Sequence, residues 1–220
     1  DLHSFPTRRS SDLNLFASLS AACLMVQGGY TSVSKAVRDS FFHISSVVTT
    51  TGYATTDYNI WPSFPKVLIL ILTITGACAS STGGGVKMIR ILTAIKFVKR
   101  GFFMKLHPHR VINLTVNREP VQQTVVSNIV NFLFLYIAVL FAGTAIVSID
   151  GYDIVTNFTA ALTCLSNVGP GLGAVGPAGN FAGFSDFSTL ILAILMIAGR
   201  LELFTFFMMF SRHYWNSNRV

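Results

Sequence analysis

The sequence predicts an all-α integral membrane protein made of two repeats, each with a re-entrant short helix and a loop between longer helices. Of its 220 residues, 51% are hydrophobic and only 11% are charged, whereas soluble domains carry about 25% charged residues. The stretch from Thr124 to Ile149 contains no charged side chain, and about 20 apolar residues cross the hydrocarbon layer as a helix. In addition, the order of helices and glycine-containing loops occurs twice along the chain.

The first repeat is predicted to occupy residues 13–105. Residues 1–12 are polar and unlike the apolar run that follows them, so we interpret them as a non-native leader. The repeat itself is predicted to contain, in order, an apolar helix at Leu13–Val26, a short helix at Ser34–Val47, the loop sequence TTTGY at 49–53, an apolar helix at Val67–Ala79, the glycine run ASSTGGG at 79–85 and a basic helix ending at Arg100.

The second repeat, residues 124–220, follows a predicted cytoplasmic linker at 106–123. It has the same order of parts: a span at Thr124–Ile149, a short helix at Ile154–Leu165, the loop sequence SNVGPGLG at 166–173 and an apolar stretch at Phe187–Phe210.

Basic residues indicate which side of the membrane each segment faces. Eight of the sixteen Lys and Arg residues lie between Lys87 and Arg118, and no acidic residue interrupts them. Cytoplasmic loops carry such an excess, so residues 87–118 and the C-terminus are predicted to be cytoplasmic and the loops after the short helices to face outside. Anionic membrane lipids or a docking protein would both fit the basic block. No aromatic-interleaved motif supports nucleic-acid binding.

The two short helices predict a path for a cation. Neither is long enough to cross a bilayer, so each is expected to enter from outside and to end in a loop near the middle. Non-helical backbone at that depth must be buried or line a water-filled path, where carbonyl oxygens can replace the hydration shell of an alkali ion. Glycine gives the backbone the freedom to orient those carbonyls, and the C-terminal end of a helix favours a cation.

Five stretches resemble the Trk/Ktr/HKT potassium-uptake family, and most closely its bacterial TrkH-type transmembrane subunits: TTTGYATTDYNIWP at 49–62, GACASSTGGGVKMIR at 76–90, HPHRVI at 107–112, SNVGPGLG at 166–173 and GRLELFT at 199–205. The resemblance implies four helix–pore-loop–helix repeats around one pore, of which this chain would supply the third and fourth as a fragment. It implies potassium uptake across the bacterial inner (plasma) membrane, with K⁺ as the transported ion, no enzymatic activity and no bound cofactor. The partners it implies are a second copy of the parent protein, a cytosolic nucleotide-binding regulatory subunit and membrane lipids.

By position, the resemblance assigns the potassium-binding filter to Thr50, Thr51, Gly52 and Tyr53 in the first loop and to Asn167, Val168, Gly169 and Pro170 in the second. It assigns gating to an intramembrane glycine loop and to an arginine below the filter, namely Gly83, Gly84, Gly85 and Arg200. A charged side chain within a span costs about 2.5–3.5 kcal/mol on insertion scales, which favours a functional role for this arginine. Glu202 is two residues away, so a direct pair between the two is not expected on a helix.

Three alternatives to passive or gated potassium permeation stay open. Sodium- or proton-coupled potassium symport would use the same sequence features. A membrane enzyme acting on lipid phosphates would need a base near Ser80, Ser81 and Thr82, but no His, Asp or Glu is close in sequence, and the glycine run lacks phosphate-loop spacing and a preceding strand. As a fragment, the chain could also act as an assembly subunit without a pore of its own.

Overall fold

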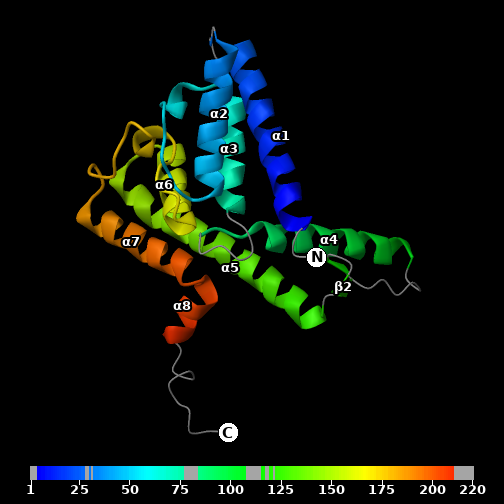
Figure 1. Ribbon diagram of the computed structural model, residues 1–220. Helices are drawn as coiled ribbons and strands as arrows, with labels where there is room; N and C mark the ends of the chain where they lie inside the picture. The colour runs from blue at the N-terminus through cyan, green and yellow to red at the C-terminus, as the bar shows by residue number, and fades with distance from the viewer. Residues whose placement is uncertain are drawn as a thin grey trace.

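A computed structural model of the protein describes residues 4–27, 30, 32–76, 84–107, 115–116, 119–120 and 122–210. Eight α-helices account for most of these residues: α1 (Ser4–Gln27), α2 (Val33–Val48), α3 (Ser63–Thr75), α4 (Met88–Leu106), α5 (Gln123–Val147), α6 (Ile154–Ser166), α7 (Asp186–Arg200) and α8 (Leu203–Met209) (Figure 1). Single 3₁₀ turns occur at η1 (Tyr58–Ile60), η2 (Ser148–Asp150) and η3 (Gly173–Val175). The predicted all-helical fold is therefore confirmed.

The linker contains a small departure from that prediction. Two-residue strands, β1 (Thr115–Val116) and β2 (Glu119–Pro120), pair antiparallel there. Such a short pair has little stability of its own, so it does not alter the helical architecture.

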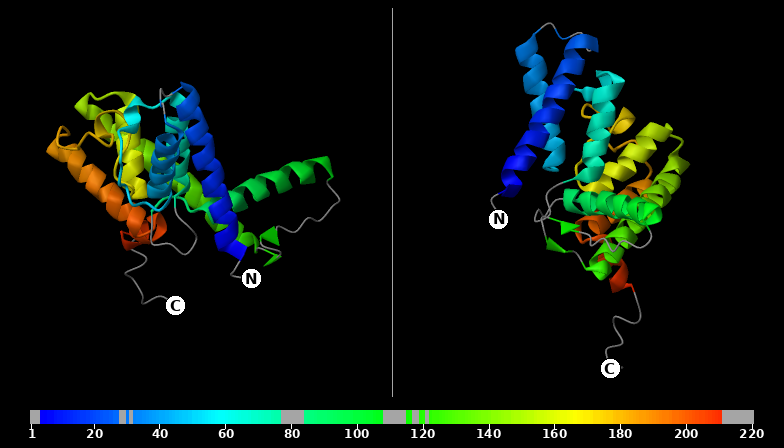
Figure 2. Two further views of the ribbon diagram at one scale, coloured as in Figure 1. Left: turned by 45° about the horizontal axis from the view of Figure 1, so that its top comes forward. Right: turned by 90° about the vertical axis from the view of Figure 1, so that its right-hand side faces the viewer.

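The helices form two groups that meet along the middle of the molecule. Helices α1, α2 and α3 pack on one another, α5, α6 and α7 form the second group, and α3 contacts α6 (Figures 1 and 2). Helix α4 packs on α5 from Arg90, which lies over Phe132, to Arg100, which donates to Gln123, and its last turns extend beyond both groups.

Each group has its own core, but the two cores share side chains. Val168 and Leu172 come from the second half of the sequence, yet they are buried in the first group together with Tyr58 and Leu72. Conversely, Val86 from the first half lies in the core of the second group. The two groups are thus interlocked beside the predicted loops, because each contributes apolar side chains to the other's core.

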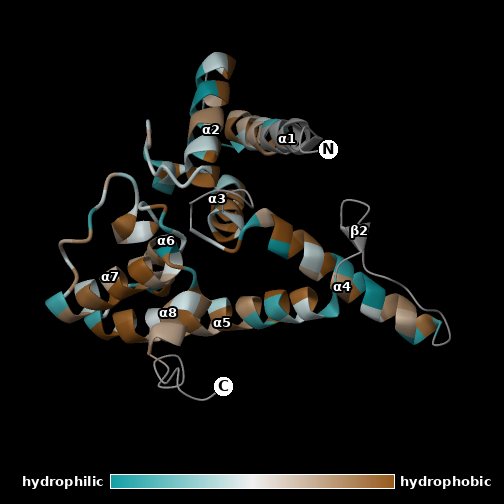
Figure 3. Cartoon of the chain, turned by 60° about the horizontal axis from the view of Figure 1, so that its bottom comes forward, coloured by the Kyte–Doolittle hydropathy of each residue, from teal (hydrophilic) through white to brown (hydrophobic). Residues whose placement is uncertain are grey.

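Helix α5 continues through η2 as a helix from Gln123 to Asp150, long and apolar enough to cross a membrane. Within the described part of the chain, α7 and α8 would count as a second span if they are one broken helix, since they pass the same test together and are bent by 111°. Figure 3 shows hydrophobic residues along most of α7, whereas α4 alternates between hydrophobic and hydrophilic residues. The break after Arg200 falls at the two charged residues of the last apolar stretch, Arg200 and Glu202.

Two helices are longer than predicted. Helix α1 begins at Ser4 instead of Leu13, because no residue in this stretch prevents a helix and Pro6 falls in the first turn, where proline is tolerated. Helix α4 runs six residues past Arg100 to Leu106. Its last two turns are largely exposed, so their helical state rests on local preference and not on packing.

Candidate functional site: paired loops and the helix breaks beneath them

The first predicted filter loop begins where α2 ends. The Thr50 amide donates to the Val47 carbonyl at 3.1 Å, and the Thr51 amide donates to Ser46 at 2.8 Å. Thr50 has a φ of +56° and Gly52 a φ of +79°. The left-handed region is open to glycine but costs other residues about 1–2 kcal/mol, so the Thr50 backbone is held there by its surroundings.

The second loop repeats this backbone pattern after α6. The Asn167 amide donates to Cys164 at 3.1 Å, and the Val168 amide donates to Thr163 at 3.0 Å. Asn167 has a φ of +55° and Gly169 a φ of +115°. Both loops therefore leave their helix through the same two hydrogen bonds and the same alternation of left-handed residues, although their sequences differ.

The two loops touch each other. A Cβ atom on Gly52 would overlap the carbonyl oxygen of Val168 and would lie 3.2 Å from Cδ of Pro170. A side chain therefore has no room at Gly52. Tyr53 is placed differently, because the residue is 74% exposed and only its backbone belongs to the loop.

The segment that follows the first loop is fixed by a buried aromatic cluster. The His43 ring of α2 packs edge-on against Tyr58 and Trp61, with ring centroids 5.6 and 4.9 Å away, and its Nε2 lies 3.0 Å from the Thr56 carbonyl oxygen. Burial, helped by the nearby Asp57 carboxylate, raises the pKa of the Tyr58 phenol well above its usual value, so Tyr58 stays neutral. His43 thus has a packing role in this cluster.

Two glycines lie against the end of α6. Gly84 belongs to the break between α3 and α4, and Gly199 lies next to the break between α7 and α8; we call these the two helix breaks. A Cβ on Gly84 would overlap the Ser166 carbonyl, and a Cβ on Gly199 would overlap the Leu165 carbonyl. These carbonyls directly precede the second loop, so the predicted gating segment lies beneath it. Gly83 lies outside the described residues, whereas Gly85 is described and has a φ of +82°.

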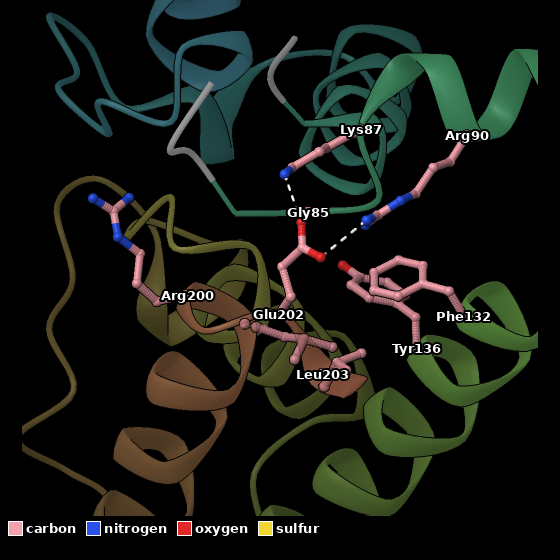
Figure 4. A pocket seen from close by; sticks show the side chains of 10 residues that line it. Gly85, Lys87, Arg90, Phe132, Tyr136, Arg200, Glu202 and Leu203 are labelled. Atoms are coloured by element: carbon pink, nitrogen blue, oxygen red, sulfur yellow. Dashed lines mark hydrogen bonds and ion pairs between the residues drawn. The ribbon is translucent and has the colours of Figure 1, made fainter. Parts of the chain in front are cut away.

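An ion-pair cluster, made of Lys87, Arg90 and Glu202, joins the two helix breaks (Figure 4). Lys87 Nζ lies 2.7 Å from Glu202 Oε1, and Arg90 Nη2 lies 3.1 Å from Glu202 Oε2. The Arg90 guanidinium also stacks 4.1 Å from the centre of the Phe132 ring. The cluster borders a pocket of about 320 Å³ that Gly85, Tyr136 and Arg200 also line.

Sequence reasoning missed this cluster, although a signal for it was present. Lys87 and Glu202 each stand three positions after a glycine, Gly84 or Gly199, and each precedes a helix as its N-cap residue. Their backbone conformations match, with φ values of +66° and +62°. Equivalent positions in the two repeats therefore carry opposite charges, which aligning GGVK with GRLE would have revealed.

Arg200 is the last residue of α7 and lines the same pocket as Gly85. Its side chain is exposed in this chain and extends away from the ion-pair cluster in Figure 4. Arg200 and Gly85 therefore lie near each other, and the Arg200 side chain points in a different direction from that of Glu202.

In the described residues the fold is all-helical apart from one short strand pair, and two short helices, α2 and α6, each end in a loop with the same backbone pattern. The chain belongs to the TrkH family of cation transport proteins, which matches residues 13–217. The resemblance predicted from the five sequence stretches is thereby confirmed. Because the family consists of cation transport proteins, the alternative of an enzyme that acts on lipid phosphates is removed.

Several curated proteins and a solved structure are similar to this chain. It is 36% identical over 176 residues to the Trk system potassium uptake protein TrkI of Halomonas elongata, covering 79% of this chain and 36% of that protein. It is 33% identical over 186 residues to TrkH of Escherichia coli K12, which covers 84% of this chain and 38% of that protein. The crystal structure of the potassium transporter TrkH from Vibrio parahaemolyticus superposes on this chain with a TM-score of 0.84 at 33% sequence identity. The match covers 92% of this chain and 43% of that structure's chain. The chain thus spans roughly two fifths of the length of these relatives.

Proposed function

We propose that this chain supplies two of the four pore-loop repeats of a potassium-conducting pore. The observation that supports this proposal most directly is the pair of loops. Both follow a short helix, both have the same backbone pattern, and Gly52 lies against Val168. Two equivalent loops in contact are half of a ring of carbonyls, and rings of this kind replace the water shell of K⁺ in selective pores. The potassium uptake named for its relatives supports K⁺ as the cargo.

In this proposal the backbone of Thr50, Thr51, Gly52 and Tyr53 faces the ion from one side, and the backbone of Asn167, Val168, Gly169 and Pro170 faces it from another. The short helices α2 and α6 both end at this point, so their C-terminal partial negative charges favour a cation there. Each repeat would therefore contribute one wall of the filter, and two further repeats of a longer parent protein would close it.

The glycine segment and Arg200 form the proposed gate. Gly84 and Gly199 allow the two helix breaks to press against α6 directly beneath the second loop. Glycine is needed there because a Cβ would strike backbone, and a break in a helix is a point at which it can bend. Movement at Gly83–Gly85 would thus change access to the filter without rebuilding it.

The family match supports extending the proposal to the setting of the parent protein. We propose a location in the bacterial inner membrane, with residues 87–118 and the C-terminus on the cytoplasmic side, and a parent that forms homodimers. The basic, exposed part of α4 would suit docking of a cytosolic nucleotide-binding regulatory subunit or contact with anionic lipids.

A direct test reconstitutes the full-length parent in proteoliposomes and measures reversal potentials in opposing potassium and sodium gradients. A passive potassium pore gives a reversal potential close to that of K⁺ and independent of a proton gradient. Sodium- or proton-coupled symport instead moves the reversal potential with the coupling ion. Absence of potassium flux from correctly folded parent would rule out the proposal.

Arg200→Ala is expected to raise unregulated potassium flux. A fixed positive charge about 5 Å from a K⁺ ion opposes it by about 3 kcal/mol at an effective dielectric of 20, and water in the pore reduces this. Arg200→Lys is expected to keep more of the barrier, because the charge stays, although the planar guanidinium is lost. Flux into proteoliposomes at matched incorporation of the three proteins checks this. Equal flux in all three would remove the gating role.

A further inference from the structure

One side chain ties the two repeats together at the opposite end of α3 from the ion-pair cluster. Asn59 lies in η1, immediately before α3, and its Nδ2 donates to the Gly173 carbonyl at 3.0 Å. The Gly173 amide in turn donates to Asn59 Oδ1 at 3.0 Å. The side-chain amide thus satisfies both backbone groups of one residue that lies 114 positions further along the chain.

Asn59 and Gly173 are each held in place by other residues of the same half of the chain. On one side, the Asn59 amide N–H donates to Asp57 Oδ1 at 2.9 Å, which caps η1. Its neighbours Tyr58 and Trp61 are buried in the aromatic cluster with His43. Asn59 is therefore presented by a rigid turn, and its side chain is not free to follow a moving partner.

The partner turn, η3, is fixed to α6 by two threonine hydroxyls. The Leu172 amide donates to Thr159 Oγ1 at 3.1 Å, and the Ala174 amide donates to Thr156 Oγ1 at 3.2 Å. Gly173 has a φ of +69°. A Cβ on Gly176 would overlap Nδ2 of Asn59, so a glycine at this position makes room for the amide.

We propose that Asn59 is a positioning residue that sets the ion discrimination of the paired loops. This inference rests on the proposed filter function. Asn59 follows Tyr53 by six residues and Gly173 follows Pro170 by three, so their contact fixes the outer ends of both loops relative to each other. The loops meet at Gly52 and Val168, and a shift between the repeats would change the spacing of their carbonyls. Discrimination between K⁺ and Na⁺ depends on that arrangement of carbonyls.

The test uses the full-length parent carrying Asn59→Ala, Asn59→Asp, Asn180→Ala or Gly52→Ser. Asn180 is the matched control: it is an exposed asparagine in the same outer region, and its Oδ1 accepts from the amide of Ala182, two residues further along the chain. Two quantities are measured for each variant, namely the potassium-to-sodium permeability ratio and the potassium flux at saturating concentration per incorporated protein.

Asn59→Ala is expected to lower the permeability ratio about fivefold, the effect of losing one or two neutral hydrogen bonds, while saturating flux changes by less than about twofold. Asn59→Asp should fall between wild type and alanine, because its carboxylate still accepts from the Gly173 amide but cannot donate to the carbonyl. Its added charge attracts both cations alike, so the ratio reports position and not local concentration. Asn180→Ala should match wild type.

The outcomes separate this inference from the filter proposal. If Gly52→Ser lowers the ratio and Asn59→Ala does not, the filter stands and the role of Asn59 is overturned. If neither variant changes the ratio, the filter assignment fails and this inference fails with it. A fall in both ion fluxes at a constant ratio would also overturn the inference, since it indicates a stability effect alone. Should Asn59→Ala not fold, the intermediate ratio expected of Asn59→Asp carries the test.

Discussion

Gly52→Ser in the full-length parent is expected to lower the potassium-to-sodium permeability ratio by about tenfold or more, the equivalent of at least about 1.4 kcal/mol of discrimination. The residue has a φ of +79°, which costs a non-glycine residue about 1–2 kcal/mol. In addition, its new Cβ would overlap the Val168 carbonyl of the other loop. The carbonyl has to move, and it is one of those proposed to coordinate the ion. Reversal potentials in mixed potassium and sodium solutions measure the change.

Gly151→Ser supplies a matched control for backbone strain. Gly151 has nearly the same φ, +76°, but no atom lies within 4 Å of the position its Cβ would take. The two variants therefore share the cost of the left-handed conformation, and only Gly52→Ser has the clash. We expect an unchanged ratio in Gly151→Ser. Equal effects in the two variants would show that strain, and not contact between the loops, explains the result.

Glu202→Ala is expected to loosen the proposed gate and to raise basal potassium flux about tenfold. The substitution leaves Lys87 and Arg90 with side chains only 17% and 21% exposed and without their shared carboxylate. Losing one charged partner of a partly buried pair costs about 1.5–3 kcal/mol, and the 43% exposure of the Glu202 side chain places the effect near the lower figure. Lys87 lies two residues after Gly85, so we expect loosening of the cluster to release the proposed gate.

Charge reversal makes this second prediction specific. Glu202→Lys alone should raise basal flux at least as much as alanine, because it places three cations together. Combining it with Lys87→Glu restores an opposite pair at the same two N-cap positions and is expected to return flux toward wild type. Flux assays at matched incorporation, with thermal unfolding in detergent as a check on folding, test the series. If the basal flux of the double variant is as high as that of Glu202→Lys, the ion pair does not hold the proposed gate.

Local signals in the sequence determined most of the helical architecture. The predicted short helices at Ser34–Val47 and Ile154–Leu165 agree with α2 and α6 to within one residue at each end. The long apolar run at Thr124–Ile149 agrees with α5 and η2. These features were predictable because apolar spacing, segment length and glycine-containing helix ends are encoded by neighbouring residues. The positions of the two loops followed for the same reason.

The contacts between the repeats were decided only by the tertiary structure. Gly52 against Val168, Asn59 against Gly173 and Lys87 against Glu202 each join residues more than 100 positions apart. Nothing in the residues around Asn59 indicates that its side-chain amide contacts a particular backbone turn. The negative charge of Glu202 predicts a basic side chain nearby but does not identify which one. Partner choice depends on how whole helices pack, because only packing places side chains from distant segments within hydrogen-bonding distance.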